Sequence, residues 1–327
     1  MTDVKKADAV FEGGGVKGIG LVGAVKKVEE EGYRFENVAG TSAGAIVAAL
    51  IAAGYTASEL RGVLESLDYR RFQDKSRMDR IPVVGPVLSL ALNKGLYGGK
   101  FVEGWVRELL EAKGVRTFGD LVMETYAGDP RYRYKLRVIA SDVTRGTILV
   151  LPQEAAQYGA DPDRLSVARA VRMSAGIPFF FEPLWFQDGN GGRNYIVDGG
   201  VLSNYPVWLF DEEGDEPAWP TFGFKLVEPG EGNPRNIRGP LSLLTALFST
   251  MMEAHDSRYI ADHNFARTIP IPTLGVRTTE FDLSREKSDR LFGSGYQAAE
   301  AFFHHWDFEQ YKTRYRRQIP GRRRERV

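Results

Sequence analysis

The sequence predicts two strand-turn-helix units in succession near its N-terminus, and this repetition restricts the fold more than any other feature. In the first unit, residues 7–12 form a buried strand, 13–18 a glycine-rich loop, and apolar residues recur at helical spacing over 19–28. In the second, a strand begins at Val38 and a helix of small residues follows from Ala43. Two such units are typical of an α/β protein, and we expect both loops to lie side by side at one edge of the sheet.

The turn of the second unit, Gly40-Thr41-Ser42-Ala43-Gly44, matches the G-x-S-x-G pattern of a nucleophile elbow. Gly40 and Gly44 are needed there because a side chain at either position would collide with the neighbouring backbone. Such a turn pushes the Ser42 hydroxyl into the open at the N-terminus of a helix, where free N–H groups favour a developing negative charge. The same five residues are also compatible with an ordinary tight turn.

Composition excludes several classes of protein. The chain has 327 residues, of which 43% are apolar, and its formal net charge is zero, so no general electrostatic attraction would hold nucleic acid. The lack of cysteine excludes disulfides, thiolate metal sites and cysteine catalysis. We expect one domain over 1–327 in the cytoplasm, because the N-terminus does not match a secretory signal; export without a leader is the alternative.

The loop from Gly13 to Gly18 also matches G-x-G-x-x-G, the phosphate-binding loop of dinucleotide-binding folds. Glu36 lies near the position of a ribose-binding acid, but it precedes the second strand, whereas that acid should end it. Ser42 ends the strand instead. We therefore favour a loop whose backbone N–H groups stabilise an oxyanion beside Ser42, and keep a nucleotide-binding regulatory module as the alternative.

A serine nucleophile needs a base, and two kinds of candidate are present. The chain has four histidines, all late in the sequence: His255, His263, His304 and His305. None lies in a recognisable motif. Asp198 ends a predicted strand, and Gly199 and Gly200 after it let another backbone approach its carboxylate. Asp198 in a dyad, and a histidine-assisted triad with His255 or His263 in a general esterase or lysophospholipase, both remain open.

Further along the chain, the residue patterns predict other strands and helices. The strands are expected at 137–141, 147–151, 195–197 and 222–227, and the helices at 56–67, 101–113, 165–173, 241–261 and 286–306. Residues 81–97 are apolar, contain Pro82 and Pro86, and have cations on either side; they suit either a core segment or a movable cover that dips into a lipid surface.

Taken together, these motifs resemble those of the patatin-like phospholipases, a family of lipid acyl hydrolases. The matches are Gly13-Gly14-Gly15-Val16-Lys17-Gly18 for the oxyanion motif, Gly40-Thr41-Ser42-Ala43-Gly44 for the elbow, Asp198-Gly199-Gly200 for the catalytic aspartate, and Met173-Ser174-Ala175-Gly176-Ile177-Pro178 with Phe181-Glu182-Pro183 and Asn204-Tyr205-Pro206-Val207. The resemblance covers about 7–210, the motif-bearing core. The region after about Val227 carries no family signal, and we interpret residues 239–327 as a C-terminal helical extension.

The resemblance implies a three-layer α/β/α fold with a mostly parallel central sheet, and a Ser42–Asp198 dyad without histidine. It also implies hydrolysis of lipid carboxyl esters of the phospholipase A type through an acyl-enzyme, without metal or cofactor. The expected partners are lipid substrates, with transient contact to a membrane surface or micelle. Lys17 is expected either to meet a substrate phosphate or to be a solvated lysine of the first helical turn.

Overall fold

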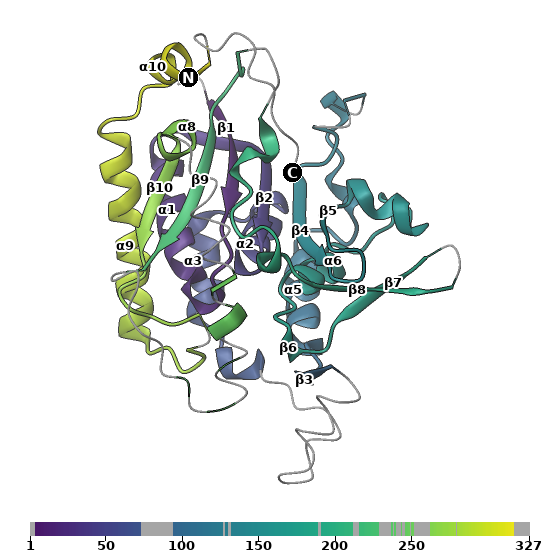
Figure 1. Cartoon of the computed structure of the whole chain (residues 1–327). Helices are drawn as coiled ribbons and strands as arrows, with labels where there is room; N and C mark the ends of the chain where they lie inside the picture. Colours follow the sequence, from purple (N-terminus) through teal and green to yellow (C-terminus); the bar gives the residue numbers. More distant parts are fainter. Residues whose placement is uncertain are drawn as a thin grey trace.

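The computed structural model describes residues 4–72, 94–126, 128–129, 132–188, 191–211, 216–228, 237, 239, 243, 246–248, 250–251, 262–278 and 280–316. Within these residues, the centre of the fold is an eight-stranded sheet in the order β10-β9-β1-β2-β4-β8-β7, with β5 paired to β4 (Figure 1). The parallel strands are β1 (Lys5–Phe11), β2 (Tyr33–Thr41), β4 (Leu136–Asp142), β9 (Thr221–Val227) and β10 (Thr268–Pro272). The antiparallel strands are β5 (Thr147–Leu151), β7 (Leu184–Gln187) and β8 (Arg193–Asp198).

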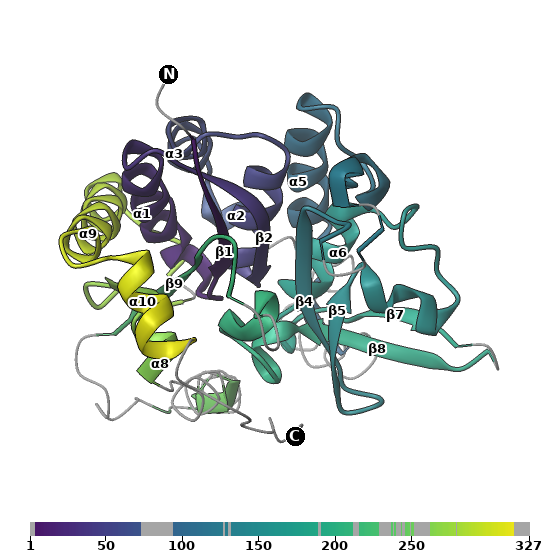
Figure 2. The same ribbon diagram turned by 90° about the horizontal axis from the view of Figure 1, so that it is seen from above.

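Helices cover both faces of this sheet. Figure 2 shows one group along one face: α1 (Gly18–Glu30), α2 (Ala43–Ala52), α3 (Ala57–Glu65), α5 (Lys100–Ala112), α6 (Val167–Ser174) and α9 (Arg285–Phe303). The short α8 (Asp262–Phe265) and α10 (Phe308–Tyr315) lie on the other face. The expected fold class, α/β in three layers with a mostly parallel central sheet, is confirmed.

The central strands are apolar on both sides because both faces are covered. In β1, Phe11 packs into the large core beneath α1 and α2, whereas Val10 contacts Phe210 on the opposite face, together with Ala39 of β2. Strands buried on both faces have largely apolar sequences, and this pattern predicts the first two strands. The carboxyl ends of β1 and β2 therefore lie next to each other at one sheet edge.

Most expected elements are confirmed, with bounds that shift by a few residues. The sequence patterns do not predict β10, β7, or the two-stranded sheet of β3 (Gly95–Tyr97) and β6 (Phe179–Phe181). β10 was missed because Pro270 and Pro272 disfavour a strand; they are tolerated since β10 is an edge strand of the sheet. Residues 81–92 and most of 241–261 lie outside the described residues. No helix in the described part of the chain combines the length and apolar composition needed to cross a membrane.

Candidate active site

Strand register brings Ser42 and Asp198 together although 155 residues separate them in the sequence. Thr41 of β2 pairs with Ile139 of β4, and the next residue of β4, Ala140, pairs with Asp198 of β8. Ser42 follows Thr41 and is therefore level with Asp198 across β4. The Ser42 hydroxyl donates a hydrogen bond of 2.8 Å to Asp198 Oδ2.

Ser42 has the backbone conformation of a strained elbow, with φ 54° and ψ −122°. A Cβ on Gly40 would lie 2.3 Å from the backbone of Gly44, and a Cβ on Gly44 would lie 2.3 Å from the carbonyl oxygen of Phe11. Both glycines are thus required, as the sequence predicted. The expectation of an open hydroxyl is wrong, however, because Ser42 is only 5% exposed.

Asp198 is fully buried, and burial controls its acidity. Burial raises the pKa of its carboxyl to about 7, although hydrogen bonds from Gly200 and Ser42 and the more distant charge of Arg172 oppose the rise. Gly200 N–H donates to Oδ1 at 2.8 Å, opposite the oxygen that accepts from Ser42. A carboxylate with this pKa is a far better proton acceptor at neutral pH than an exposed aspartate.

The segment that includes Ser174 and Gly176 holds the backbones of both residues. Ser42 N–H donates to Ser174 Oγ at 2.9 Å, and Ser174 Oγ donates to the Ile139 carbonyl at 2.5 Å. Asp198 N–H donates to the Gly176 carbonyl at 2.9 Å. The sequence showed this segment only as a matching pattern, and these contacts now give it a role in positioning both side chains.

The glycine loop lies directly beside Ser42, since a Cβ added to Gly13 would fall 3.1 Å from the Cβ of Ser42. Most N–H groups of the loop already have acceptors: Gly13 donates to Asn204 O, Val16 to Thr278 O, Lys17 to Gly14 O and Gly18 to Gly15 O. The N–H groups of Gly14 and Gly15 have none in the described part of the chain. These two amides are therefore the available donors for an oxyanion, whereas Val16 N–H is used within the fold.

Gly15 is in the left-handed region, with φ 58°, and a Cβ there would lie 2.1 Å from the Thr278 carbonyl oxygen. The close approach of the chain at Thr278 thus requires a glycine at this position. Lys17 is buried and pairs with Glu228 at 2.7 Å. The interpretation of Lys17 as a solvated lysine is wrong, and its charge is already paired within the protein.

Comparison with known families agrees with this geometry, because the model of the patatin-like phospholipases matches residues 9–211. The chain belongs to the patatin-like phospholipase family. It is 44% identical over 303 residues to the uncharacterized protein YqhO of Bacillus subtilis, covering 92% of this chain and 99% of that protein. It is 27% identical over 208 residues to the cUMP-AMP-activated phospholipase of Escherichia coli, covering 60% of this chain and 55% of that one.

Among solved structures, VipD from Legionella pneumophila shares the fold, with a TM-score of 0.55 and 19% sequence identity. The match covers 91% of this chain and 66% of the VipD chain. The family match ends at Asp211, so β10, α9 and α10 lie beyond it. The Thr278 contact with the glycine loop therefore comes from outside the matched region.

Two further polar residues, Glu12 and Asn204, hold the glycine loop in place, although the sequence did not mark either as a functional position. Glu12 is buried between the end of β1 and the glycine loop, where it accepts hydrogen bonds from Lys225 Nζ at 3.0 Å and Asn204 Nδ2 at 3.3 Å. Asn204 Nδ2 also reaches the Gly13 carbonyl at 3.3 Å. Glu12 and Asn204 thus join the start of the loop to the segment after Asp198. The sequence signal that could have identified Glu12 is a charged residue directly after a buried strand.

The described histidines lie near the amino ends of the parallel strands, whereas Ser42 follows the carboxyl end of β2. His304 and His305 follow α9, whose last residue, Phe303, stacks on Tyr33 at the start of β2. His263 is in α8, which precedes the first residue of β10. His255 lies outside the described residues. Within those residues, no group of three or more histidine, aspartate or glutamate side chains could hold a metal ion.

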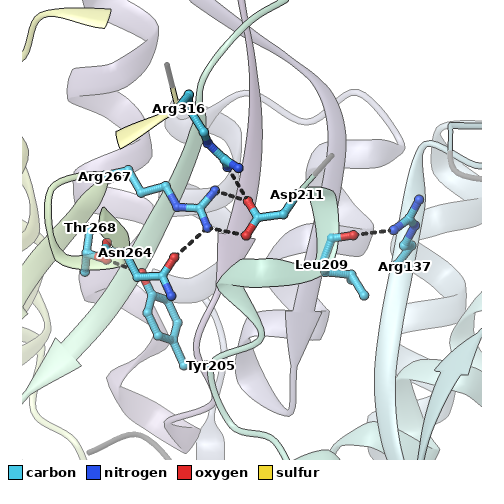
Figure 3. Close-up of polar contacts among 8 residues, drawn as sticks. All are labelled: Arg137, Tyr205, Leu209, Asp211, Asn264, Arg267, Thr268 and Arg316. Atoms are coloured by element: carbon cyan, nitrogen blue, oxygen red, sulfur yellow. Dashed lines mark hydrogen bonds and ion pairs between the residues drawn. The ribbon is translucent and has the colours of Figure 1, made fainter. Parts of the chain in front are cut away.

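Another buried carboxylate, that of Asp211, lies thirteen residues after Asp198 in a different environment (Figure 3). Arg267 donates to both of its oxygens, at 2.5 and 3.0 Å, and Arg316 donates to Oδ1 at 2.8 Å. Burial alone would raise its pKa, but Arg267 and Arg316 more than offset burial and hold the pKa below its ordinary value. Asp211 therefore anchors the end of the segment that begins at Asp198.

Proposed function

We propose that this protein is a serine lipid acyl hydrolase of the phospholipase A type, which cleaves carboxyl esters of phospholipids or related lipids. The observation that carries the proposal is the hydrogen bond of 2.8 Å from Ser42 Oγ to a buried Asp198 whose pKa is raised to about 7. Membership of the patatin-like family and the name of the phospholipase from E. coli support the substrate class.

In the proposed reaction, Asp198 Oδ2 accepts the proton of Ser42 while Oγ attacks the carbonyl carbon of the ester. The carbonyl oxygen becomes an oxyanion, which the N–H groups of Gly14 and Gly15 stabilise. Collapse of this intermediate breaks the ester bond, and the leaving alcohol takes the proton from Asp198. Water then gives a proton to Asp198 and attacks the acyl-enzyme, which forms a second tetrahedral intermediate. Collapse of this intermediate breaks the bond to Ser42 Oγ, releases the fatty acid and returns the proton from Asp198 to Ser42.

A fluorophosphonate probe tests the nucleophile, because it reacts only with an activated serine. We expect labelling of one peptide, the one that contains Ser42, and release of fatty acid from phosphatidylcholine by the unlabelled enzyme. Ser42→Ala should abolish both signals while leaving the circular dichroism spectrum unchanged. Labelling at another serine, or phospholipid hydrolysis that survives Ser42→Ala, would refute the proposal.

Two alternatives predict different results. A nucleotide-binding module would not be labelled at Ser42 and would bind ATP or NAD in calorimetry. A general esterase with a histidine-assisted triad would be labelled, but it would lose hydrolysis when its histidine is replaced. His263, His304 and His305 lie near the amino ends of the parallel strands, away from Ser42. This location argues against any of the three as the base and favours the dyad.

A further inference from the structure

Exposed apolar side chains gather on a helical segment that packs beside Asp198. The described residues 243, 246–248 and 250–251 are helical. Phe248 is buried against Val197 and Val201, which lie on either side of Asp198-Gly199-Gly200. On the outer side, Leu243, Leu247 and Met251 follow one another at intervals of four residues and are 44%, 52% and 40% exposed. Such spacing places all three on one helical face, with the apolar side toward solvent.

A fourth exposed apolar residue comes from the segment that fixes the Asp198 backbone. Phe179 follows the Gly176 carbonyl, which accepts Asp198 N–H, and Ile177, which packs against the cluster of Phe248, Val197 and Val201. Phe179 is 44% exposed, and its φ of 67° is unfavourable for a residue with a large side chain. Exposure and backbone strain both cost folding free energy, and such features concentrate at functional positions.

We propose that Phe179, Leu243, Leu247 and Met251 form an apolar rim that enters the surface of a lipid aggregate and brings the acyl chain to Ser42. This proposal rests on the proposed lipid hydrolase function. The rim has no charged member and the chain has no net charge, so apolar burial, and not attraction to anionic head groups, provides the affinity. The lipid aggregate is the favoured occupant because both parts of the rim border the residue that activates the nucleophile.

The rim is distinct from the cover that the sequence pattern suggests at residues 81–97. That segment lies outside the described residues up to Asn93, and its end, β3, pairs with β6 so that Gly95 is opposite Phe179. The cover remains a prediction, and the two segments would be neighbours at this point. Variants confined to Phe179, Leu243, Leu247 and Met251 test the rim without altering residues 81–97.

The test removes apolar area without adding charge. In one variant, Leu243, Leu247 and Met251 are replaced together by Gln; in a second, Phe179→Asn removes the ring but tolerates the left-handed backbone. The matched control is Phe265→Gln, since Phe265 is 64% exposed but lies in α8, near the amino end of β10 and away from Asp198. Binding to phosphatidylcholine vesicles is measured by flotation in a Ser42→Ala background, so that the lipid stays intact.

We expect at least a tenfold loss of vesicle binding in the triple variant, a smaller loss for Phe179→Asn, and no change for the control, because partial burial of three side chains is removed. In the active enzyme, the ratio of p-nitrophenyl butyrate hydrolysis to vesicle hydrolysis should rise at least tenfold. Unchanged vesicle binding in both rim variants, or equal loss in the control, would overturn the rim. If the triple variant does not fold, Phe179→Asn alone decides.

Other occupants give other results. If the wild type is a dimer by size exclusion and the triple variant dissociates it, the face is an interface between copies and the proposal is wrong. Failure of the proposed function is separable, because it would appear as absent hydrolysis of both substrates and absent labelling of the wild type. Vesicle flotation would still report on the rim in that case.

Discussion

Asp198 ends β8 and Asp211 lies thirteen residues further along the chain. Both have buried carboxylates, yet their pKa values move in opposite directions. In the described residues, the Asp198 carboxyl accepts hydrogen bonds from two neutral donors, the Ser42 hydroxyl and Gly200 N–H. Asp211 accepts from two guanidinium groups (Figure 3). Burial acts on both, so the bonded cations decide the sign of the shift. Within the described residues no cation is bonded to Asp198, and its pKa near 7 is what a base at neutral pH requires.

The two environments have opposite consequences for stability. An ionised Asp198 without a bonded cation destabilises the folded protein, because its charge has lost water and gained only neutral donors. Asp211 stabilises the fold through its pairs, and breaking them would leave Arg267 buried and charged. The proposed base, Asp198, thus lowers stability, whereas Asp211, which anchors the chain, raises it.

The largest expected effect is on activity in Asp198→Asn. The amide is nearly isosteric but cannot accept the serine proton, so hydrolysis should fall at least about a thousandfold. At pH 8 the variant should be more stable than the wild type, by roughly 1 to 4 kcal/mol in urea denaturation, since the destabilising charge is gone. Loss of activity together with loss of stability would mean that Asp198 is mainly a structural residue.

The opposite change in stability is expected for Asp211→Asn. Removing the carboxylate leaves two guanidinium groups beside one another, and the free energy of unfolding should fall by about 3 to 5 kcal/mol. Arg316→Gln is the matched control, because it keeps the doubly bonded pair of Arg267 and Asp211 and should cost about 1 kcal/mol. Wild-type stability in Asp211→Asn would break the contrast between the two carboxylates.

The pH dependence of stability separates the two residues further. A raised pKa means that the folded protein binds a proton the unfolded chain has lost, so ionisation of Asp198 lowers stability between about pH 4 and pH 7. The stability gained in Asp198→Asn should therefore grow over that range and level off above it. Asp8 is also raised to about 7, but it is present in both proteins and cancels in the difference. A difference that does not change with pH would contradict the raised pKa.

Asp211 gives the reverse dependence. Its pKa is lowered from 3.8, so its contribution is complete above that value and is lost as the pH falls through the folded-state pKa. The stability deficit of Asp211→Asn should accordingly stay constant from about pH 5 to pH 8 and shrink only in stronger acid. If the stability deficit of Asp211→Asn instead shrank near pH 7, the raised pKa would belong to Asp211 and not to Asp198.

The smallest effect is expected at the histidines. We expect hydrolysis of a soluble ester to stay within about twofold of the wild type in His263→Gln, His304→Gln and His305→Gln. These residues lie near the amino ends of the parallel strands, away from Ser42. His255→Gln belongs in the same series, with the same expectation from the sequence. A loss of several orders of magnitude in kcat at any one of them, with intact fold, would replace the dyad by a triad.

The sequence could predict the elbow, the glycine loop and their shared sheet edge, because parallel strands place the turns after them together. It could not predict the register that brings Asp198 level with Ser42, since β8 runs antiparallel and its short pattern carries no direction. It also could not predict that the Thr278 carbonyl accepts a hydrogen bond from Val16 N–H, because that contact joins residues 262 positions apart. The raised pKa depends on burial, which only the assembled fold determines.

The rate at which a fluorophosphonate labels Ser42, measured against pH, shows directly whether Asp198 activates the serine. If Asp198 is the base, the wild-type rate should rise through an apparent pKa of about 7 and reach a plateau above it, with Asp211→Asn following the same curve in its folded fraction. Asp198→Asn should label slowly, without this step. A step that persists in Asp198→Asn would show that another group activates the serine and would contradict the account.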